Sequence, residues 1–209
     1  MADEPSISTK NTACWSCKGP VAEAALFCDT CSAIQPPGQA DHFTRFGQPA
    51  SFDLDPAALE TAYFDLQRKL HPDRFATRSG REKALSQSQA VAVNEAYETL
   101  CDPLRRAAYL LSLKGRKADV DRDSTINDPE LLMESMEARE ALAEAQTVDE
   151  VVGLSRETNA KVRSCEQDLA AAFAAGNLDQ AGELTTRLKY LGKLAGETRA
   201  RRLKLAGRG

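Results

Sequence analysis

The sequence predicts an all-α protein: a small tetracysteine metal knuckle, then a helical hairpin, then a three-helix bundle. Two C-x-x-C pairs lie near the N-terminus, apolar residues recur at helical spacing in the segments that follow, and Asp-Pro pairs and other capping residues mark helix starts. The expected divisions are a metal-binding segment with its linker at 1–39, the hairpin unit at 40–116, a polar linker at 117–127 and the bundle at 128–209.

Length and composition exclude several classes of protein. The chain has 209 residues, of which 42% are hydrophobic, so it is long enough to bury a core. Its net charge of −4 argues against a general nucleic-acid binder, and no apolar run approaches the length that crosses a bilayer. We therefore expect neither nucleic acid nor a membrane as a partner.

The N-terminal residues and the cysteines indicate the compartment. Residues 1–11 carry two acids before the first Lys and no apolar block, so they match neither a secretory signal nor an Arg-rich transit peptide. Four of the six cysteines form the two C-x-x-C pairs, which is a metal pattern and not a secreted disulfide framework. We expect a reducing compartment: a bacterial cytoplasm or, as the alternative, a mitochondrial matrix.

The paired cysteines are the candidate metal ligands. Cys14 and Cys17 form the first pair, Cys28 and Cys31 form the second, and ten residues separate the pairs. Two such turns place four thiolates around one point, which favours structural Zn²⁺; iron in the same four-sulfur cage and a redox-active dithiol are the alternatives. The segment is too short to fold by burial alone, so we expect metal binding to supply its folding energy. The same segment is the candidate surface for a homodimer.

Apolar stripes predict the helices of the hairpin unit. One helical turn is expected at 41–47, closed by a glycine, and Asp55 with Pro56 caps the next helix. The stripe of that helix is Leu59, Ala62, Tyr63, Leu66 and Leu70. A helix from about residue 82 to 100 carries Leu85, Val93, Tyr97 and Leu100, which can pack against this stripe. Asp102-Pro103 restarts a helix that ends at Gly115.

The loop inside the hairpin holds the tripeptide His71, Pro72 and Asp73. Pro72 lacks an N–H and disfavours the helical conformation at His71, so the helix must stop near Leu70. An imidazole and a carboxylate are thereby left on a solvated turn. The basic residues beside them are Arg68, Lys69 and Arg74. Without further context, the alternative is a proline-terminated helix with a surface aspartate.

The first helix of the bundle carries two different apolar sides. Asp128-Pro129 caps it, and its core stripe is Leu131, Ser135, Ala138, Leu142 and Ala145. The other side combines apolar and acidic residues: Leu132, Met133, Met136, Glu137, Glu140 and Glu144. Exposed Met-rich surface beside acids is typical of partner binding, whereas the alternative is that this side packs on a neighbouring helix or on the hairpin unit.

Two further helices complete the predicted bundle. Thr147 and Glu150 form a capping box, and the seam that follows is Val151, Ser155, Thr158, Val162, Cys165, Leu169 and Ala172. Gly176-Asn177 closes this helix and Asn177 begins the last one. The stripe of the last helix is Leu184, Leu188, Leu191 and Ala195, with Tyr190 lying off it.

The hairpin with its basic face and His-Pro-Asp loop resembles a J-domain, which stimulates ATP hydrolysis by DnaK-type chaperones. Several segments narrow the resemblance to the HscB co-chaperones of iron–sulfur cluster biogenesis. These are 41–47, Leu66-Gln67-Arg68, Phe75-Ala76, Asn94-Glu95-Ala96-Tyr97 and the apolar Tyr109-Leu110-Leu111-Ser112-Leu113. The resemblance extends from about Asp41 to the C-terminus, and the cysteine segment resembles the extension of longer members.

The resemblance implies a co-chaperone and not an enzyme. It implies that a DnaK/HscA-type chaperone is contacted by His71, Pro72, Asp73, Arg68, Lys69 and Arg74. It implies that an IscU-type scaffold protein is contacted by Leu132, Met133, Met136, Glu137, Glu140, Glu144 and Tyr190. Such a protein delivers the scaffold to the chaperone and stimulates the ATPase of the chaperone.

Other functions remain as alternatives. A J-domain co-chaperone for general protein folding would share the loop. A zinc-knuckle adaptor for nucleic acid would need a basic face on the knuckle, where only Lys10 and Lys18 occur. A small zinc enzyme would need an open metal position, and the two histidines of the chain have no nucleophile partner in sequence.

Overall fold

The computed structural model describes residues 11–116 and 129–207, and within them the protein is all-α apart from a short sheet in the knuckle. The predicted fold class is confirmed. Two compact units are present: an N-terminal unit, with residues up to 50 and 54–102, and a C-terminal unit, with 51–53 and residues from 103 onward. The predicted linker at 117–127 lies outside the described residues, and the predicted domain boundaries stay a prediction.

The N-terminal unit begins with the knuckle. Strand β1 (Asn11–Ala13) pairs antiparallel with β2 (Pro20–Ala22), and Phe27 bridges to Ile34. Helix α1 (His42–Arg45) follows, and Gly47, two residues beyond its end, has a φ of 64°, which glycine adopts at no steric cost. The knuckle is therefore built on short strands, which the cysteine pattern did not predict.

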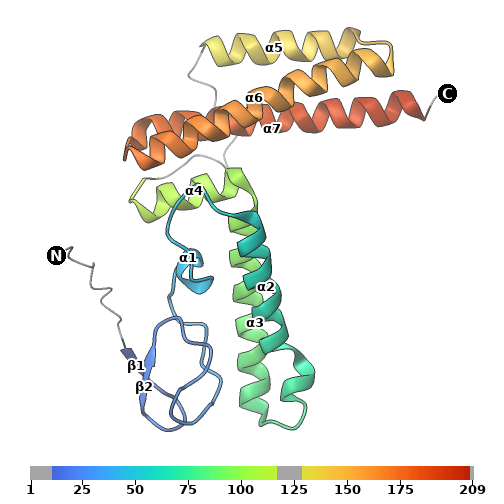
Figure 1. The fold of residues 1–209 in the computed structure, drawn as a ribbon. Coiled ribbons are helices and arrows are strands. Elements are labelled where there is room, and N and C mark those ends of the chain that lie inside the picture. Colours follow the sequence, from blue (N-terminus) through green and yellow to red (C-terminus); the bar gives the residue numbers. More distant parts are fainter. Residues whose placement is uncertain (1–10, 117–128, 208–209) are drawn as a thin grey trace. The chain divides into compact units, whose positions relative to one another are not determined.

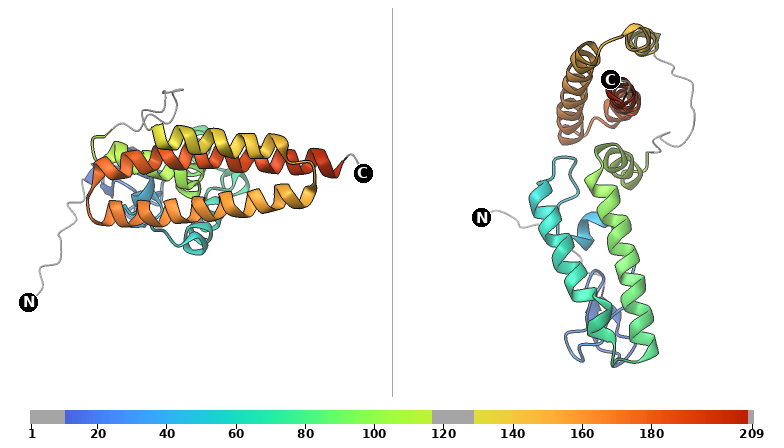
Figure 2. Two further views of the ribbon diagram at one scale, coloured as in Figure 1. Left: turned by 90° about the horizontal axis from the view of Figure 1, so that it is seen from above. Right: turned by 90° about the vertical axis from the view of Figure 1, so that its right-hand side faces the viewer.

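Helices α2 (Pro56–Leu70) and α3 (Gly80–Cys101) form the hairpin, and Figures 1 and 2 show them antiparallel and side by side. Asp55 accepts the N–H of Ala57 at 2.9 Å and so caps α2. Ser79 and Glu82 form a capping box at the start of α3, which begins at Gly80, two residues before the predicted start at about residue 82. The predicted packing of the two stripes is confirmed by the stacked rings of Tyr63 and Tyr97, whose centroids lie 3.9 Å apart.

The C-terminal unit contains α4 (Pro103–Leu113), α5 (Pro129–Glu144), α6 (Val148–Ala174) and α7 (Leu178–Ala206). Figure 2 shows α5, α6 and α7 side by side, with α6 antiparallel to α7. Glu134 pairs with Arg187 at 2.6 Å and Arg139 pairs with Glu197 at 3.0 Å. The partners advance along both helices in the same direction, so α5 and α7 run parallel.

Helix α7 has a wider buried face than its sequence stripe predicts. The predicted Leu188 and Leu191 are buried, but Ala181, Thr185 and Leu194 are buried as well. The reason is that α4, α5 and α6 all pack on α7, so one stripe cannot serve every neighbour. The seam of α6 is confirmed at its buried positions, which are Val151, Thr158, Cys165, Leu169 and Ala172.

Phe52 is a core residue of the C-terminal unit that the sequence did not single out. It is 4% exposed, and its ring stacks on Phe173 with 5.7 Å between centroids. The guanidinium of Arg106 lies 4.9 Å from the centroid of the same ring.

Among the described residues, none of the helices is sufficiently long and apolar to cross a membrane.

The leucines of the C-terminal unit test this core. Leu169 on α6 is fully buried, whereas Leu203 on α7 is 65% exposed. Leu169→Ala should lower the free energy of unfolding by about 3 kcal/mol, because it removes buried methyl groups and leaves a cavity. Leu203→Ala should change that free energy by less than about 0.5 kcal/mol. Urea denaturation followed by circular dichroism measures both, and equal effects would contradict this core.

Candidate functional site

The four predicted metal ligands converge in the knuckle. The sulfur atoms of Cys14, Cys17, Cys28 and Cys31 all lie within 4.8 Å of one another. The Sγ atoms of Cys14 and Cys31 are 3.7 Å apart, and those of Cys17 and Cys28 are also 3.7 Å apart. A tetrahedral ion with metal–sulfur bonds of about 2.3 Å has sulfur–sulfur edges of about 3.8 Å. The four cysteines are therefore positioned to bind one metal ion.

Two turns with the same backbone pattern hold these ligands. The N–H of Lys18 donates to the carbonyl of Cys14 at 3.0 Å, and that of Ser32 donates to the carbonyl of Cys28 at 2.8 Å. Lys18 and Ser32 have φ values of 66° and 58°, so each turn carries its left-handed residue directly after the second cysteine.

Backbone and side-chain donors stabilise a thiolate at Cys14. Burial acts to raise the pKa of this thiol, but the N–H groups of Cys17 and Ser16 and the amide of Gln35 stabilise the thiolate more, so the pKa falls from 9.0 to about 6. The Gly19 N–H likewise acts to lower the pKa of Cys17, but the neighbouring sulfurs raise it to about 11. Four thiolates cannot share this space without a cation, and a divalent metal ion would remove that conflict.

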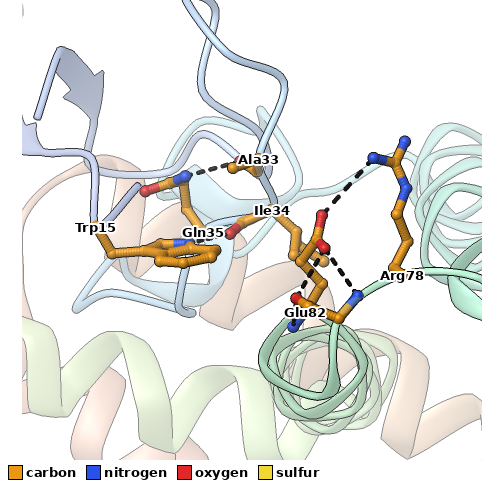
Figure 3. A network of polar contacts seen from close by, with 7 residues as sticks. Trp15, Ala33, Ile34, Gln35, Arg78 and Glu82 are labelled. Atoms are coloured by element: carbon orange, nitrogen blue, oxygen red, sulfur yellow. Dashed lines mark hydrogen bonds and ion pairs between the residues drawn. The ribbon is translucent and has the colours of Figure 1, made fainter. Parts of the chain in front are cut away.

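Gln35 is a supporting residue that the sequence analysis missed. The sequence predicts no role for it within the metal-binding segment and linker at 1–39. It is 4% exposed, and its Nε2 donates to Cys14 Sγ at 3.4 Å and to the carbonyl of Ala33 at 2.7 Å. Trp15, between the first two ligands, donates its indole N–H to the carbonyl of Ile34 at 2.6 Å (Figure 3). A glutamine in a proline- and glycine-rich stretch carries no local pattern that predicts either contact.

The His-Pro-Asp loop is held by its backbone and leaves its side chains in solvent. His71 ends α2 with φ −55° and ψ 133°, and a 3-10 turn, η1 (Pro72–Phe75), follows. His71 Nδ1 accepts the N–H of Asp73 at 3.3 Å. The side chains of His71 and Asp73 are 59% and 91% exposed, whereas Phe75 is buried. The loop is thus anchored at Phe75 and presents an imidazole and a carboxylate outward.

The predicted basic residues lie beside this loop at the surface. Arg68, Lys69 and Arg74 are all exposed. Arg68 contacts Asp65 at 3.2 Å, an exposed pair that contributes little to stability. Their positive charges therefore lie at the surface beside the loop.

The second candidate surface lies on α5. Leu132, Met133 and Met136 are 44%, 61% and 63% exposed, although α5 buries Leu131 and Leu142 on its core side. The acids that the sequence placed with them are exposed as well, namely Glu137, Glu140 and Glu144. Within residues 103–116 and 129–207 of the C-terminal unit, these three apolar side chains are thus exposed, whereas Leu131 and Leu142 are buried.

Tyr190 lies on α7 at the level of this surface. It falls between Arg187, which pairs with Glu134 of α5, and Glu197, which pairs with Arg139. The ring is partly exposed, and Lys193 Nζ lies 6.0 Å from its centroid. Along the helix axis, Tyr190 therefore lies at the level of residues 134–139 of α5.

Comparisons with known proteins bear on both units. Residues 51–109 match the DnaJ domain family, and residues 127–199 match the family described as the HSCB C-terminal oligomerisation domain. The chain is 34% identical over 196 residues to the human iron–sulfur cluster co-chaperone protein HscB, covering 92% of this chain and 83% of the relative. It is 40% identical over 164 residues to a co-chaperone protein HscB homolog of Azoarcus sp., covering 76% of this chain and 92% of the relative.

The fold also matches a solved structure. The crystal structure of human co-chaperone protein HscB superimposes with a TM-score of 0.85 at 33% identity, covering 93% of this chain and 100% of that chain. The human matches are long enough to extend into the tetracysteine segment, and the relatives come from both bacteria and eukaryotes.

Loss of the cysteine ligands should release the metal. Replacing Cys14 and Cys17 together by serine leaves two thiolates, too few to hold the ion, so the bound metal should fall from one equivalent to a trace. Cys101→Ser is the matched control, because Cys101 is an exposed cysteine outside the cluster. Elemental analysis of the purified proteins measures the difference, and unchanged metal content in the double variant would rule the site out.

Proposed function

Because this chain belongs to the HscB family of iron–sulfur cluster co-chaperones, we propose that it binds an IscU-type scaffold protein and delivers it to a DnaK/HscA-type chaperone. It stimulates the ATPase of that chaperone and performs no catalysis of its own. The observation that carries the proposal is the presence of two exposed surfaces, the His-Pro-Asp loop and the apolar, acidic side of α5, in two separate compact units.

The loop supports the chaperone half of the proposal. Its polar side chains are exposed and have no role in the core, whereas the residues next to them, Leu70 and Phe75, are buried. The buried Leu70 and Phe75 hold the backbone on either side of the loop, and the side chains of His71 and Asp73 extend into solvent. The basic residues on α2 and after the loop add a positive surface that would steer an acidic partner toward the loop.

The side of α5 supports the scaffold half. A leucine and two methionines exposed by 44–63% form an apolar surface on a helix whose opposite side already fills the core. Methionine adapts its shape to a partner, and aromatic residues are enriched in interfaces, so Tyr190 fits the same surface. Glu137, Glu140 and Glu144 would form the charged rim and favour a basic partner.

Zinc is the proposed metal of the knuckle. All four ligands are cysteines, and a closed four-sulfur site is usually structural, with no open position for catalysis. Iron in the same cage would show thiolate-to-metal absorption bands, which zinc lacks. Thiolate ligands require a reducing compartment, so we place the protein in a bacterial cytoplasm or a comparable compartment.

Substitutions in the loop test the chaperone half. His71→Gln or Asp73→Asn should abolish stimulation of the ATPase of a DnaK-type chaperone at saturating scaffold, because each removes an exposed recognition group. Circular dichroism and thermal unfolding should be unchanged, since both side chains lie in solvent. Asp168→Asn, an exposed aspartate on α6, is the control and should stimulate as the wild type does. Full stimulation by both loop variants would contradict the assignment.

Substitutions on α5 test the scaffold half. Truncating one anchoring apolar side chain costs about 1–2 kcal/mol, or about tenfold in affinity, so Leu132→Ala with Met136→Ala should weaken scaffold binding about a hundredfold. Isothermal titration calorimetry measures the affinity. Stimulation of the chaperone in the absence of scaffold should persist.

The control is Leu203→Ala, a leucine outside the proposed surface that is 65% exposed, which should bind the scaffold normally. A double variant that melts at a markedly lower temperature would show that Leu132 and Met136 belong to the core. A folded double variant with wild-type affinity would place the scaffold elsewhere.

A further inference from the structure

The knuckle contacts α3, and two of these contacts involve a residue beside the metal ligands. The guanidinium of Arg81 lies 4.1 Å from the ring centroid of Trp15, which follows Cys14 in the chain. The side-chain amide of Gln89 donates to the backbone carbonyl of Gln35 at 3.0 Å. The side chain of Gln35 donates in turn to Cys14 Sγ at 3.4 Å. Trp15 and Gln35 therefore both connect Cys14 to α3: Trp15 is its neighbour in the chain, and Gln35 donates a hydrogen bond to its sulfur.

The same stretch of α3 positions the His-Pro-Asp loop. The capping box of Ser79 and Glu82 begins α3 only a few residues after the loop, and Arg78 pairs with Glu82 at 3.8 Å (Figure 3). Farther along, Ser86 Oγ donates to the carbonyl of Leu70 at 3.0 Å, directly before His71. The first three turns of α3 therefore contact the knuckle through some side chains and the ends of the loop through others.

The knuckle has little to keep it folded without a metal ion. Its own buried cluster consists of Cys14, Val21 and Cys28, with Ala25 packed against it, and two of these residues are ligands. Removing the ion leaves a small apolar group to hold the turns in place. The first turn of α3 is exposed at Gly80, Arg81 and Lys83, so it depends on its side-chain contacts more than on burial.

We propose that the metal-loaded knuckle clamps the first three turns of α3 and thereby holds the His-Pro-Asp loop in its chaperone-competent conformation. Arg81, Trp15 and Gln89 are the positioning residues, and metal occupancy sets how well the clamp holds. The effect of this clamp on the chaperone rests on the proposed function, whereas the contacts that form the clamp do not. Cys17 and Cys31 are exposed, so the ion is accessible to chelators and to competing thiols.

Hydrogen exchange of the full-length protein tests the clamp without a chaperone. After zinc is removed with EDTA, the amides of residues 83–90 should exchange about tenfold faster or more, because their turns lose the knuckle contacts. The amides of residues 91–100, in the second half of α3, are the internal control and should change little. Identical exchange of residues 83–90 with and without zinc would overturn the proposal.

Arg81→Gln separates the clamp from the metal site. It keeps a helix-forming side chain and all four ligands but removes the cation over Trp15, so zinc should stay bound while residues 83–90 exchange faster. Stimulation of the chaperone ATPase should fall about threefold, the size expected for one exposed cation–π contact. Lys83→Gln removes a charge from the same helix and should behave as the wild type does.

The two readouts keep the failures distinct. If Arg81→Gln lowers ATPase stimulation but leaves exchange as in the wild type, Arg81 contacts the chaperone directly and the clamp is wrong. If exchange depends on zinc but the wild-type protein stimulates no DnaK-type ATPase, the proposed function fails, and with it the functional role of the clamp.

Discussion

The hydrogen bond from Ser86 to the carbonyl of Leu70 is the contact on which the N-terminal unit depends. Pro72 prevents α2 from continuing, so the last carbonyl groups of α2 have no intrahelical donor. Ser86 supplies one at 3.0 Å, and both residues are buried, where an unpaired carbonyl would be costly. This bond joins α2 to α3 at the point where the chain reverses. It positions His71 and Asp73 through the backbone, which leaves their side chains in solvent.

In both candidate interaction surfaces, buried residues hold the chain in place while their neighbours in sequence are exposed. In the loop, the buried Phe75 anchors the chain beside the exposed Asp73. On α5, Leu131 fills the core while its neighbours in sequence, Leu132 and Met133, are exposed. A helix places adjacent residues about 100° apart, so one short segment can serve the core and a partner at once. Residues of the candidate surfaces can therefore be substituted without removing a buried core side chain.

Buried threonine hydroxyls in the C-terminal unit donate to backbone carbonyl groups, as the Ser86 hydroxyl does in the N-terminal unit. Helix α7 is shared by α4, α5 and α6, and it buries Thr185 and Thr198 among these neighbours. Their hydroxyls donate to carbonyls of their own helix, Thr185 to Ala181 at 2.6 Å and Thr198 to Ala195 at 3.0 Å. Threonine thus fills space between closely packed helices without leaving an unsatisfied hydroxyl.

The sequence by itself determined the features that rest on neighbouring residues. Caps such as Asp55 and Thr147, apolar residues at helical spacing, the proline that ends α2 and the two C-x-x-C pairs all act over a few positions, and the structure has each of them. Only the tertiary structure decided the contacts that join distant segments. Gln89 reaches Gln35 across 54 positions, and Phe52 stacks on Phe173. Neither pair follows a local pattern, because the partner of each side chain is set by how the helices pack.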